Sequence, residues 1–505
     1  MRVLTALTAA VMSVVRKLRG GTRRPAGGGS PVLLLAAFGV AIAQTIVLAA
    51  LAVFARELDV SATGATWLLT AFMLASAVAT PVAGRIGDLF GHRRVIVTGL
   101  ALLLAGSLVA AVSTEFGSYT GVVAGRVIQG FSGGVFPCAF GLARQNLPAE
   151  RLGGVVAALS SMFGVGGAFG MVVAGPLVGV SGPAALFWLV AALALLALAG
   201  MVRVPSPSAS AAPAGRVDFA GAALLAGALV ALLLAISQGR AWGWSSPGII
   251  ALFVTAVAFA AVFALVERRV AAPLVDLRLL TGPRLLATNV ATLVVGMGMF
   301  AAVTLLPLFV QTPTALGYGF GYSPARTGVL MAPIAVCTLL AAPLAARISD
   351  ALGARAAFRA GAVLAAIALG GLGLLHGHIA QVLLWSALLG LAYGLAFSSL
   401  GGLVVGAVSQ EQTGAATGVN TILRTVGGAL GAVLATVIVT SAATAPGQPP
   451  AESGYTTAFI VAGAIALCAA AVTASRGAVT AQPGYESVNA EPGEGRWPSG
   501  GNDVG

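Results

Sequence analysis

The sequence contains little charge. Only 8% of its 505 residues are Asp, Glu, Lys or Arg, whereas 58% are hydrophobic, and the mean hydropathy is +0.99. A soluble domain normally has about 25% charged residues at its disposal to face water. This chain has too few, and a lipid bilayer is the solvent that suits its composition. The composition therefore predicts an all-α polytopic membrane protein.

Cysteine and histidine are also scarce. The three cysteines, Cys138, Cys337 and Cys468, fall in separate apolar stretches, too far apart in sequence for a disulfide framework or a zinc site. We expect them to be buried packing residues. The sequence shows no phosphate-binding loop, no Ser/His/Asp set and no metal-ligand cluster. These absences argue against an enzyme or an ATP-driven pump, and we expect no cofactor and no metal.

Apolar runs of about twenty residues, the length that spans a bilayer, dominate the chain. Fourteen such runs are predicted as membrane spans. They cover residues 32–54, 64–86, 95–114, 118–140, 153–178, 183–202, 218–237, 248–267, 286–310, 325–347, 357–375, 380–406, 413–440 and 455–475.

The net charge of +12 comes almost entirely from arginine, since Lys17 is the one lysine. Nucleic-acid binders gather basic residues on one soluble face, whereas here they lie in the connections between apolar runs. With a cytoplasmic N-terminus, 22 of the 27 basic residues fall on the inner side, as the positive-inside rule requires. We therefore expect both termini to be cytoplasmic and no nucleic-acid partner.

The spans suggest five regions. Residues 1–30 form a basic cytoplasmic segment that fits an interfacial helix on an anionic leaflet. Residues 31–203 and 286–475 form two six-helix bundles, and 204–285 hold two extra helices between them. The Gly- and Pro-containing tail, 476–505, is expected to be disordered and cytoplasmic.

A short repeat supports two related halves. Residues 84–94 read GRIGDLFGHRR, and residues 346–355 read ARISDALGAR. At a constant offset of 262, the first copy's Arg85, Ile86, Asp88, Gly91 and Arg93 match the second copy's Arg347, Ile348, Asp350, Gly353 and Arg355. Both copies follow the second predicted span of a half. Such duplication is typical of secondary transporters.

Several motifs together resemble one family, the major facilitator superfamily, and within it the fourteen-spanner drug:proton antiporter branch. The resemblance covers roughly residues 31–475. Its residues are Gly84, Asp88, Gly91, Arg93 and Arg94, Trp67, the run Arg126 to Gly130, the run Val217 to Gly221, and Gly321 to Pro324 with Gly328.

This resemblance implies a major facilitator fold of two six-helix bundles plus two extra central helices, fourteen transmembrane helices in all. It implies a plasma-membrane carrier that exports a small organic compound or drug by alternating access, with protons as the coupling ion. The expected partners are a small-molecule substrate, protons and the lipid bilayer. No obligate protein partner is inferred.

The motif between the second and third spans is interpreted as a cytoplasmic gate. It comprises Gly84, Asp88, Gly91, Arg93 and Arg94, with Asp350 and Arg355 in the second copy. Glycines allow a sharp turn and close packing, and the carboxylate is expected near the N-terminus of span three. The alternative is a positively charged anchor with a tight turn.

Polar residues inside spans are candidates for a substrate cavity or for coupling, because they are costly in a membrane. They are Gln44, Thr45, Phe72, Arg126, Gln129, Asn420 and Arg424, with Met73 and Phe169 as further lining candidates. Arg126 could instead be a structural hydrogen-bond anchor. Arg424 could extend its charge to the interface or pair structurally.

A glycine-rich run in span five resembles the branch's antiporter motif. Its residues are Gly166, Gly167, Gly170, Gly175 and Pro176, although Gly170 is followed by Met171 rather than proline. Small residues let helices pack closely, which also explains the run without any antiport function.

The first span departs from the branch. Ala43 stands where the branch carries an aspartate, and no carboxylate falls near the centre of a predicted span. Glu57, near the outer end of span one, is the nearest titratable candidate. An uncoupled facilitator or importer, or a non-transporting membrane receptor or assembly protein, therefore remains an alternative. With Arg126 in the cavity, neutral, amphipathic or anionic substrates are favoured over cations.

Overall fold

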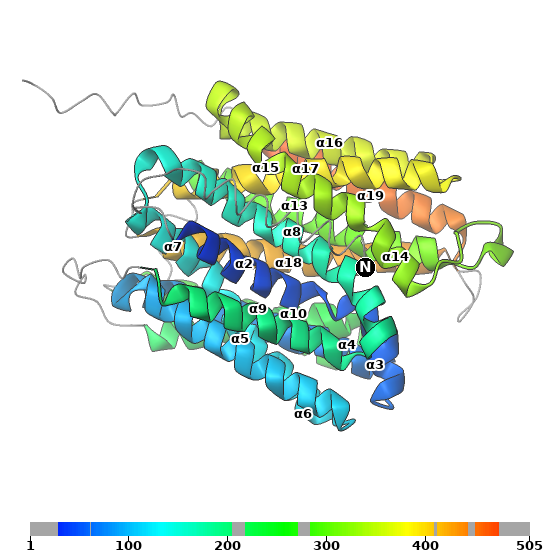
Figure 1. The fold of residues 1–505 in the computed structure, drawn as a ribbon, viewed down its shortest axis with the longest axis horizontal. Coiled ribbons are helices and arrows are strands. Elements are labelled where there is room, and N and C mark those ends of the chain that lie inside the picture. Colours follow the sequence, from blue (N-terminus) through cyan, green and yellow to red (C-terminus); the bar gives the residue numbers. More distant parts are fainter. Residues whose placement is uncertain are drawn as a thin grey trace, which may run out of the picture. The chain divides into compact units, whose positions relative to one another are not determined.

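The computed structural model describes residues 29–60, 62–204, 218–270, 283–408, 412–442 and 450–473, and the regular elements in these ranges are helices (Figure 1). These residues belong to one compact unit. The predicted interfacial helix before residue 29 and the predicted tail after residue 473 lie outside the described residues.

Twelve helices in the described part of the chain are long and apolar enough to cross a membrane. Eleven are single α-helices, and the twelfth consists of the short α14 followed by α15. Their elements are α4 (Ala62–Phe90), α5 (His92–Glu115), α8 (Ala149–Ser181), α9 (Ala184–Met201), α10 (Phe219–Trp242), α11 (Pro247–Glu267), α13 (Pro283–Gln311), α14 (Pro324–Leu330) with α15 (Ala332–Leu352), α16 (Ala354–Leu374), α17 (Ile379–Val405), α18 (Thr413–Ser441) and α19 (Glu452–Val472).

The other two predicted spans are interrupted. Residues 32–54 fall on α2 (Ser30–Thr45), the 3₁₀ turn η1 (Leu48–Ala50) and α3 (Leu51–Glu57). Residues 118–140 fall on α6 (Tyr119–Gly130), η2 (Phe131–Gly134) and α7 (Val135–Asn146). The prediction of fourteen spanning helices thus differs from the twelve that qualify by length and composition.

Glycines explain the interruption between α6 and α7. A Cβ on Gly130 would lie 2.5 Å from the Cβ of Ala75, and one on Gly134 would lie 2.1 Å from the Cβ of Ala83. The chain therefore passes against α4 at a distance that side chains would forbid. The α-helix is interrupted where the chain approaches α4 this closely, and the apolar pattern alone does not predict the interruption.

The same helix pairings occur in both halves. In the first half α2 packs on α8 and α9, α4 on α6, and α5 on α6 and α9. In the second half α13 packs on α18 and α19, α15 on α17, and α16 on α17 and α19. Helices at equivalent places in the two halves therefore have equivalent neighbours, as a duplicated fold requires.

The halves meet along two lines. On one, α8 packs against α14, α15 and α17; on the other, α18 packs against α4 and α7. The contacts along α8 are close: a Cβ on Gly401 of α17 would meet the hydroxyl of Ser160, and the Ser161 and Ser398 hydroxyls lie 2.5 Å apart. Small and polar side chains line this part of the contact, and the rings of Phe163 on α8 and Phe397 on α17 also meet across it, with 6.3 Å between their centroids.

The extra pair α10 and α11 lies outside this arrangement. The two helices pack on each other, and α10 also packs on α4 and α18. Only 17% of the 18-residue apolar stretch of α11 is buried within the protein, although the mean hydropathy of that stretch is 2.9. A helix that is apolar and so little covered by protein is suited to face lipid.

The cysteine prediction is only partly right. Cys138 is buried on α7, but Cys337 is half-buried and Cys468 is exposed on α19. An apolar run does not show which face of a helix is covered, so an exposed sulfur among apolar neighbours was not foreseen.

Candidate functional site

Arg126 on α6 lies at the centre of the first half and is fully buried. Its Nε donates to the Leu68 carbonyl at 2.7 Å, and its Nη1 donates to the Ala43 carbonyl at 2.8 Å and to Gln129 Oε1 at 2.7 Å. The guanidinium also stacks on Phe72, 4.5 Å from the ring centroid. One cation thereby joins α6 to α2 and α4.

Gln129 extends this network to a further helix. Its Nε2 donates to Ser107 Oγ on α5 at 2.7 Å. Arg126, Gln129 and Phe72, all proposed for a cavity, are at most 1% exposed. They hold four helices of one half together, and this geometry supports the anchoring alternative for Arg126.

Ala43 on α2 stands where the branch carries an aspartate. Its backbone carbonyl accepts a hydrogen bond from Arg126 Nη1. The Nη2 of Arg126 is buried without an acceptor among the described residues. The network is therefore short of one acceptor.

Arg424 on α18 has a different environment. Its guanidinium lies 3.5 Å from the ring centroid of Phe163, 5.6 Å from that of Phe397 and 6.0 Å from that of Phe136. The side chain is 7% exposed, and its Nε is buried with no acceptor among the residues that the structure describes. Phe136 and Phe163 belong to the first half, and Phe397 belongs to the second. We call these three rings and Arg424 the aromatic cage.

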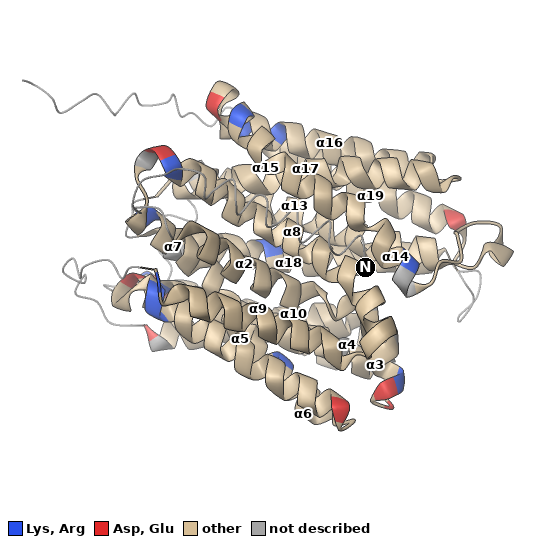
Figure 2. Ribbon diagram, viewed as in Figure 1, with Lys and Arg blue, Asp and Glu red and all other residues tan. Residues whose placement is uncertain are grey.

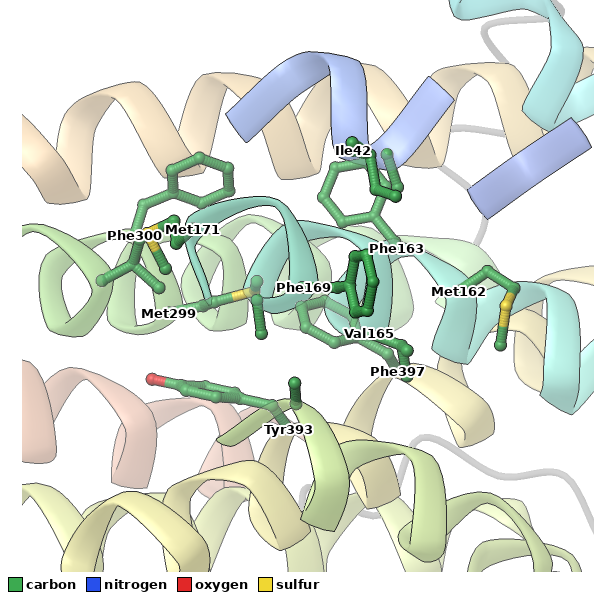
Figure 3. Close-up of a cluster of buried hydrophobic side chains, with 14 of the residues drawn as sticks. Ile42, Met162, Phe163, Val165, Phe169, Met171, Met299, Phe300, Tyr393 and Phe397 are labelled. Atoms are coloured by element: carbon green, nitrogen blue, oxygen red, sulfur yellow. The ribbon is translucent and has the colours of Figure 1, made fainter. Parts of the chain in front are cut away.

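Figure 3 shows Phe163 and Phe397 within a larger cluster of buried apolar side chains from α2, α8, α13 and α17. Tyr393 belongs to this cluster, 6.2 Å from Phe397 between ring centroids, and its hydroxyl points away from that ring. That hydroxyl is buried without a hydrogen-bond partner in the part of the chain described. Two polar groups near Phe397 therefore lack acceptors.

The remaining cavity candidates on α2, α8 and α18 have separate surroundings. Asn420, predicted to act with Arg424, instead donates to Thr292 Oγ1 on α13 at 2.6 Å. Thr45 donates to the Gly167 carbonyl at 2.8 Å and so connects α2 to α8. Gln44 is buried to 8% exposure. Phe169 packs against Phe38 with 5.3 Å between ring centroids and the ring planes tilted by 56°.

The glycine-rich run on α8 serves two contacts. Cβ atoms on Gly166 and Gly170 would lie 2.5 Å from Ala41 Cβ and 2.6 Å from Thr45 Oγ1, so this face packs on α2. Gly167 faces Thr45 and Met299 at ordinary contact distance. Gly175 and Pro176 lie half-buried nearer the end of α8.

Asp88 lies close to the N-terminus of α5, although it belongs to α4. It occupies the last turn of α4, one turn before the first residue of α5, His92, whose Nε2 is 3.4 Å from Asp88 Oδ1. Both side chains are at most 5% exposed. The carboxylate therefore contacts the first residue of α5, while its own backbone lies at the C-terminal end of α4, which by itself disfavours a carboxylate.

The turn itself is glycine-dependent in both copies of the repeat. Gly91 has φ of +100°, and Gly353 has φ of +87°. L-residues rarely adopt such backbone angles, which accounts for glycine at these two matching places. The third glycine of the motif, Gly84, is buried within α4.

The charges around the two turns differ. Arg93 donates through Nε and Nη2 to the Val204 and Met201 carbonyls, both at 2.9 Å, and so caps the end of α9. Arg94, Asp350 and Arg355 are exposed. The first copy is thus built into its half, whereas the second copy's charges face outward.

Arg144 connects the two halves, although in the sequence it counts only as one of the basic residues on the cytoplasmic side. It lies in the last turn of α7, and its Nη1 donates to the Val405 carbonyl at 2.9 Å and to Thr413 Oγ1 at 2.6 Å. Those acceptors end α17 and begin α18. No local sequence signal distinguishes Arg144 from other loop arginines.

A second polar cluster lies at the opposite end of the second half. His376 Nε2 is 2.8 Å from Glu452 Oε1, and the His376 ring packs edge-on against Phe309 at 4.9 Å. Tyr318 donates to the Pro450 carbonyl. Burial raises the pKa of Tyr318, and the neighbouring Tyr455 and Glu452 raise it further.

Charged side chains otherwise gather at helix ends and leave the helix middles almost free (Figure 2). Twelve candidate spans, two halves with matching helix pairings and buried cations define a multi-pass membrane protein with the architecture of a carrier.

The sequence profile described as Major Facilitator Superfamily matches residues 33–220 and 288–494. The chain belongs to this superfamily, and it is a secondary transporter rather than an enzyme.

Curated relatives include proteins named for resistance and export. The chain is 29% identical over 393 residues to the tetracenomycin C resistance and export protein of Streptomyces glaucescens, covering 76% of this chain and 71% of that protein. It is 31% identical over 315 residues to the puromycin resistance protein pur8 of Streptomyces alboniger, covering 61% and 59%. The multidrug transporter protein MdtP of Bacillus subtilis is 26% identical over 277 residues, covering 54% and 49%.

Solved structures share the fold. The human organic anion transporter MFSD10 (TETRAN) superposes with a TM-score of 0.63 at 16% identity, covering 89% of this chain and all of that one. The proton:xylose symporter XylE superposes with a TM-score of 0.58 at 15% identity, covering 88% and 94%. At such identities the likeness concerns the fold alone.

Proposed function

We propose that this protein exports a small organic compound from the cell by alternating access, with protons moving in the opposite direction. The proposal places fourteen crossings in the plasma membrane, with the interrupted segments α2–η1–α3 and α6–η2–α7 as the two additional spans. Both termini are then cytoplasmic, in accord with the distribution of arginine in the sequence.

The contact between the halves is the observation that carries this proposal. Each half is held together internally, the first by Arg126 and its oxygen partners. Between halves, the contact combines small side chains, such as Gly401 against Ser160, a few hydrogen bonds and the rings of Phe163 and Phe397. Two rigid bodies joined in this way can rock without losing their own cores.

The gate is proposed to lie at the end that carries the Asp88 motif. Arg144 supplies the bond between halves there, through Val405 and Thr413. The buried Asp88–His92 pair fixes the turn between α4 and α5. Opening this end requires Arg144 to release its acceptors on α17 and α18.

The substrate site is proposed to lie between the halves, beside α8. Arg424, Gln44 and Tyr393 are the polar groups there that have no hydrogen bond within the described residues. Arg126, Gln129 and Phe72 are proposed to position α2 and α4 around this site, because their own polar atoms are mostly engaged.

Export of drug-like compounds is supported by the relatives, whose names record resistance and export. Proton coupling needs a titratable group that changes its exposure during transport. The Asp88–His92 pair is a buried candidate, and Glu57 at the end of α3 is an exposed one.

An uncoupled facilitator is the second candidate. The observation that favours it is Ala43, which contacts Arg126 through its backbone carbonyl and brings no titratable side chain to the position where the branch carries an aspartate.

Proteoliposomes of the full chain test both. Ethidium, Nile red and fluorescein would represent cationic, neutral and anionic compounds, and a pH gradient would be imposed with and without an uncoupler. Uphill movement that the uncoupler abolishes supports the antiporter. Movement that only equilibrates the dye and ignores the uncoupler supports the facilitator, and no movement of any dye contradicts both.

A further inference from the structure

The environment of Arg424 is energetically incomplete. Removing a guanidinium from water costs several kcal/mol even after relaxation, and one cation–π contact returns about 0.5–2 kcal/mol. Arg126, at 0% exposure, offsets its burial with three oxygen acceptors. Arg424, at 7% exposure, has aromatic rings and no oxygen acceptor among the described residues.

The geometry leaves the hydrogen-bonding edge of Arg424 unused. A guanidinium stacked on a ring presents its face to that ring, while its N–H donors point outward in its own plane. Phe163, at 3.5 Å, takes the face. The in-plane donors match a planar carboxylate or similar oxyanion, which binds through two parallel hydrogen bonds.

The rest of the cage specifies the body of the ligand. Phe136, Phe163 and Phe397 surround the charge with ring faces and edges, which favour another aromatic group. Tyr393, beside Phe397, offers a second buried polar group without a partner in the described chain. Carboxylates that could compete as permanent counter-ions lie at helix ends in this part of the structure (Figure 2).

We propose that Arg424 and the aromatic cage bind the anionic group of an aromatic substrate, so that the substrate class is planar aromatic acids. The cage draws Phe136 and Phe163 from one half and Phe397 and Arg424 from the other. A bound acid therefore contacts both halves at once. This inference rests on the proposed transport function and names the substrate class for its site.

Binding to the purified full chain tests the inference without requiring transport. The protein would be placed in phosphatidylcholine nanodiscs and titrated with three fluorescent probes: anthracene-2-carboxylate, anthracene-2-carboxamide and 2-(aminomethyl)anthracene. Fluorescence anisotropy would give Kd, and empty nanodiscs would correct for partition into lipid. We expect the carboxylate to bind at least about tenfold more tightly than the amide, equivalent to about 1.4 kcal/mol.

Two arginine variants assign the preference. Arg424→Gln is expected to bring carboxylate and amide within about twofold of each other. Arg424→Lys keeps the charge but loses the planar fork, and should retain only part of the preference. Arg326→Gln removes one charge from an exposed arginine on α14 and should leave the preference intact.

Clear outcomes overturn the inference. Equal affinity of wild-type protein for the carboxylate and the amide does so, as does a preference that survives in Arg424→Gln or disappears in Arg326→Gln. If Arg424→Gln does not fold, the wild-type comparison still decides, together with Phe163→Leu, which should weaken all three probes while keeping their order. Ethidium movement without carboxylate preference would leave the transport proposal standing. Arg424-dependent binding without any movement would contradict transport alone.

Discussion

The two halves of the protein share a backbone plan but treat charge in opposite ways. The glycine turns at Gly91 and Gly353 and the pairings of equivalent helices are alike. In the first half, Arg126 is fully buried among oxygen acceptors, and Asp88 is buried beside His92. In the second half, Arg424 faces aromatic rings from both halves, and Asp350 and Arg355 are exposed.

This difference suggests a division of labour. Arg126 and Gln129 of the first half bond to oxygen acceptors on neighbouring helices, so they contribute rigidity. Arg424 of the second half has no oxygen acceptor among the described residues, so it remains available to a ligand. Duplicated architecture therefore does not imply duplicated chemistry, and equivalent substitutions in the two halves should have unequal effects.

The largest difference is expected between Arg126→Ala and Arg424→Ala. The first leaves the Leu68 and Ala43 carbonyls and Gln129 without their donor, at about 1–3 kcal/mol for each bare acceptor. The second removes cation–π contacts of about 0.5–2 kcal/mol and also the cost of burying the charge. Thermal unfolding in detergent should show a strong loss for Arg126→Ala and little change for Arg424→Ala. Equal losses would contradict the division.

The glycine turns should respond equally, because the backbone is where the halves agree. Gly91→Ala and Gly353→Ala each place a Cβ at positive φ with no neighbouring atom within 4 Å, so the cost is backbone strain of about 1–3 kcal/mol. Both variants should unfold at similarly lowered temperatures. Gly179→Ala, in open space within α8 and without positive φ, is the matched control.

Removing the two motif carboxylates should again separate the halves. Asp88→Asn disturbs a buried contact with His92 and is expected to lower the initial rate of dye transport by about tenfold, or about 1.4 kcal/mol. Asp350→Asn changes an exposed side chain and should stay within about twofold of wild type. Membrane insertion of both variants would be checked by size-exclusion profile. Unchanged transport in Asp88→Asn would remove the motif from the gate.

The smallest structural change is expected from Ala43→Asp. The position lies beside Arg126, whose Nη2 has no acceptor within the described chain, so a carboxylate there gains a charge-assisted partner. We expect a change in stability of less than about 1 kcal/mol and transport that becomes more sensitive to an uncoupler. Ala43→Asn, nearly identical in shape but not titratable, should not gain that sensitivity. A similar gain in both variants would argue against a proton site at this position.

Much of the fold could be predicted because a bilayer leaves few choices for an apolar run. Membrane helices and the equivalence of residues 84–94 and 346–355 followed from local patterns. The breaks at η1 and η2 did not, and the one at η2 accompanies a close approach of Gly130 and Gly134 to α4 that no local pattern reveals. Pairing between distant parts of the chain was equally inaccessible, as with Arg144 and Thr413, which join the halves.

The same limit applies to the candidate site. A lone arginine in an apolar run marks a functional or structural position but not which. Arg126 and Arg424 look alike in sequence, and only their neighbours show that Arg126 bonds to oxygen acceptors whereas Arg424 lies among aromatic rings. The aromatic residues of the cage come from three different helices, so no motif contains them.

The pair α10 and α11 has a consequence for ancestry. The two helices pack mainly on each other and on the outer side of α4 and α18, so their addition need not have altered the older contacts. Each helix in a membrane reverses the direction of the chain. Two is therefore the smallest number that could enter between duplicated halves without turning the second half upside down.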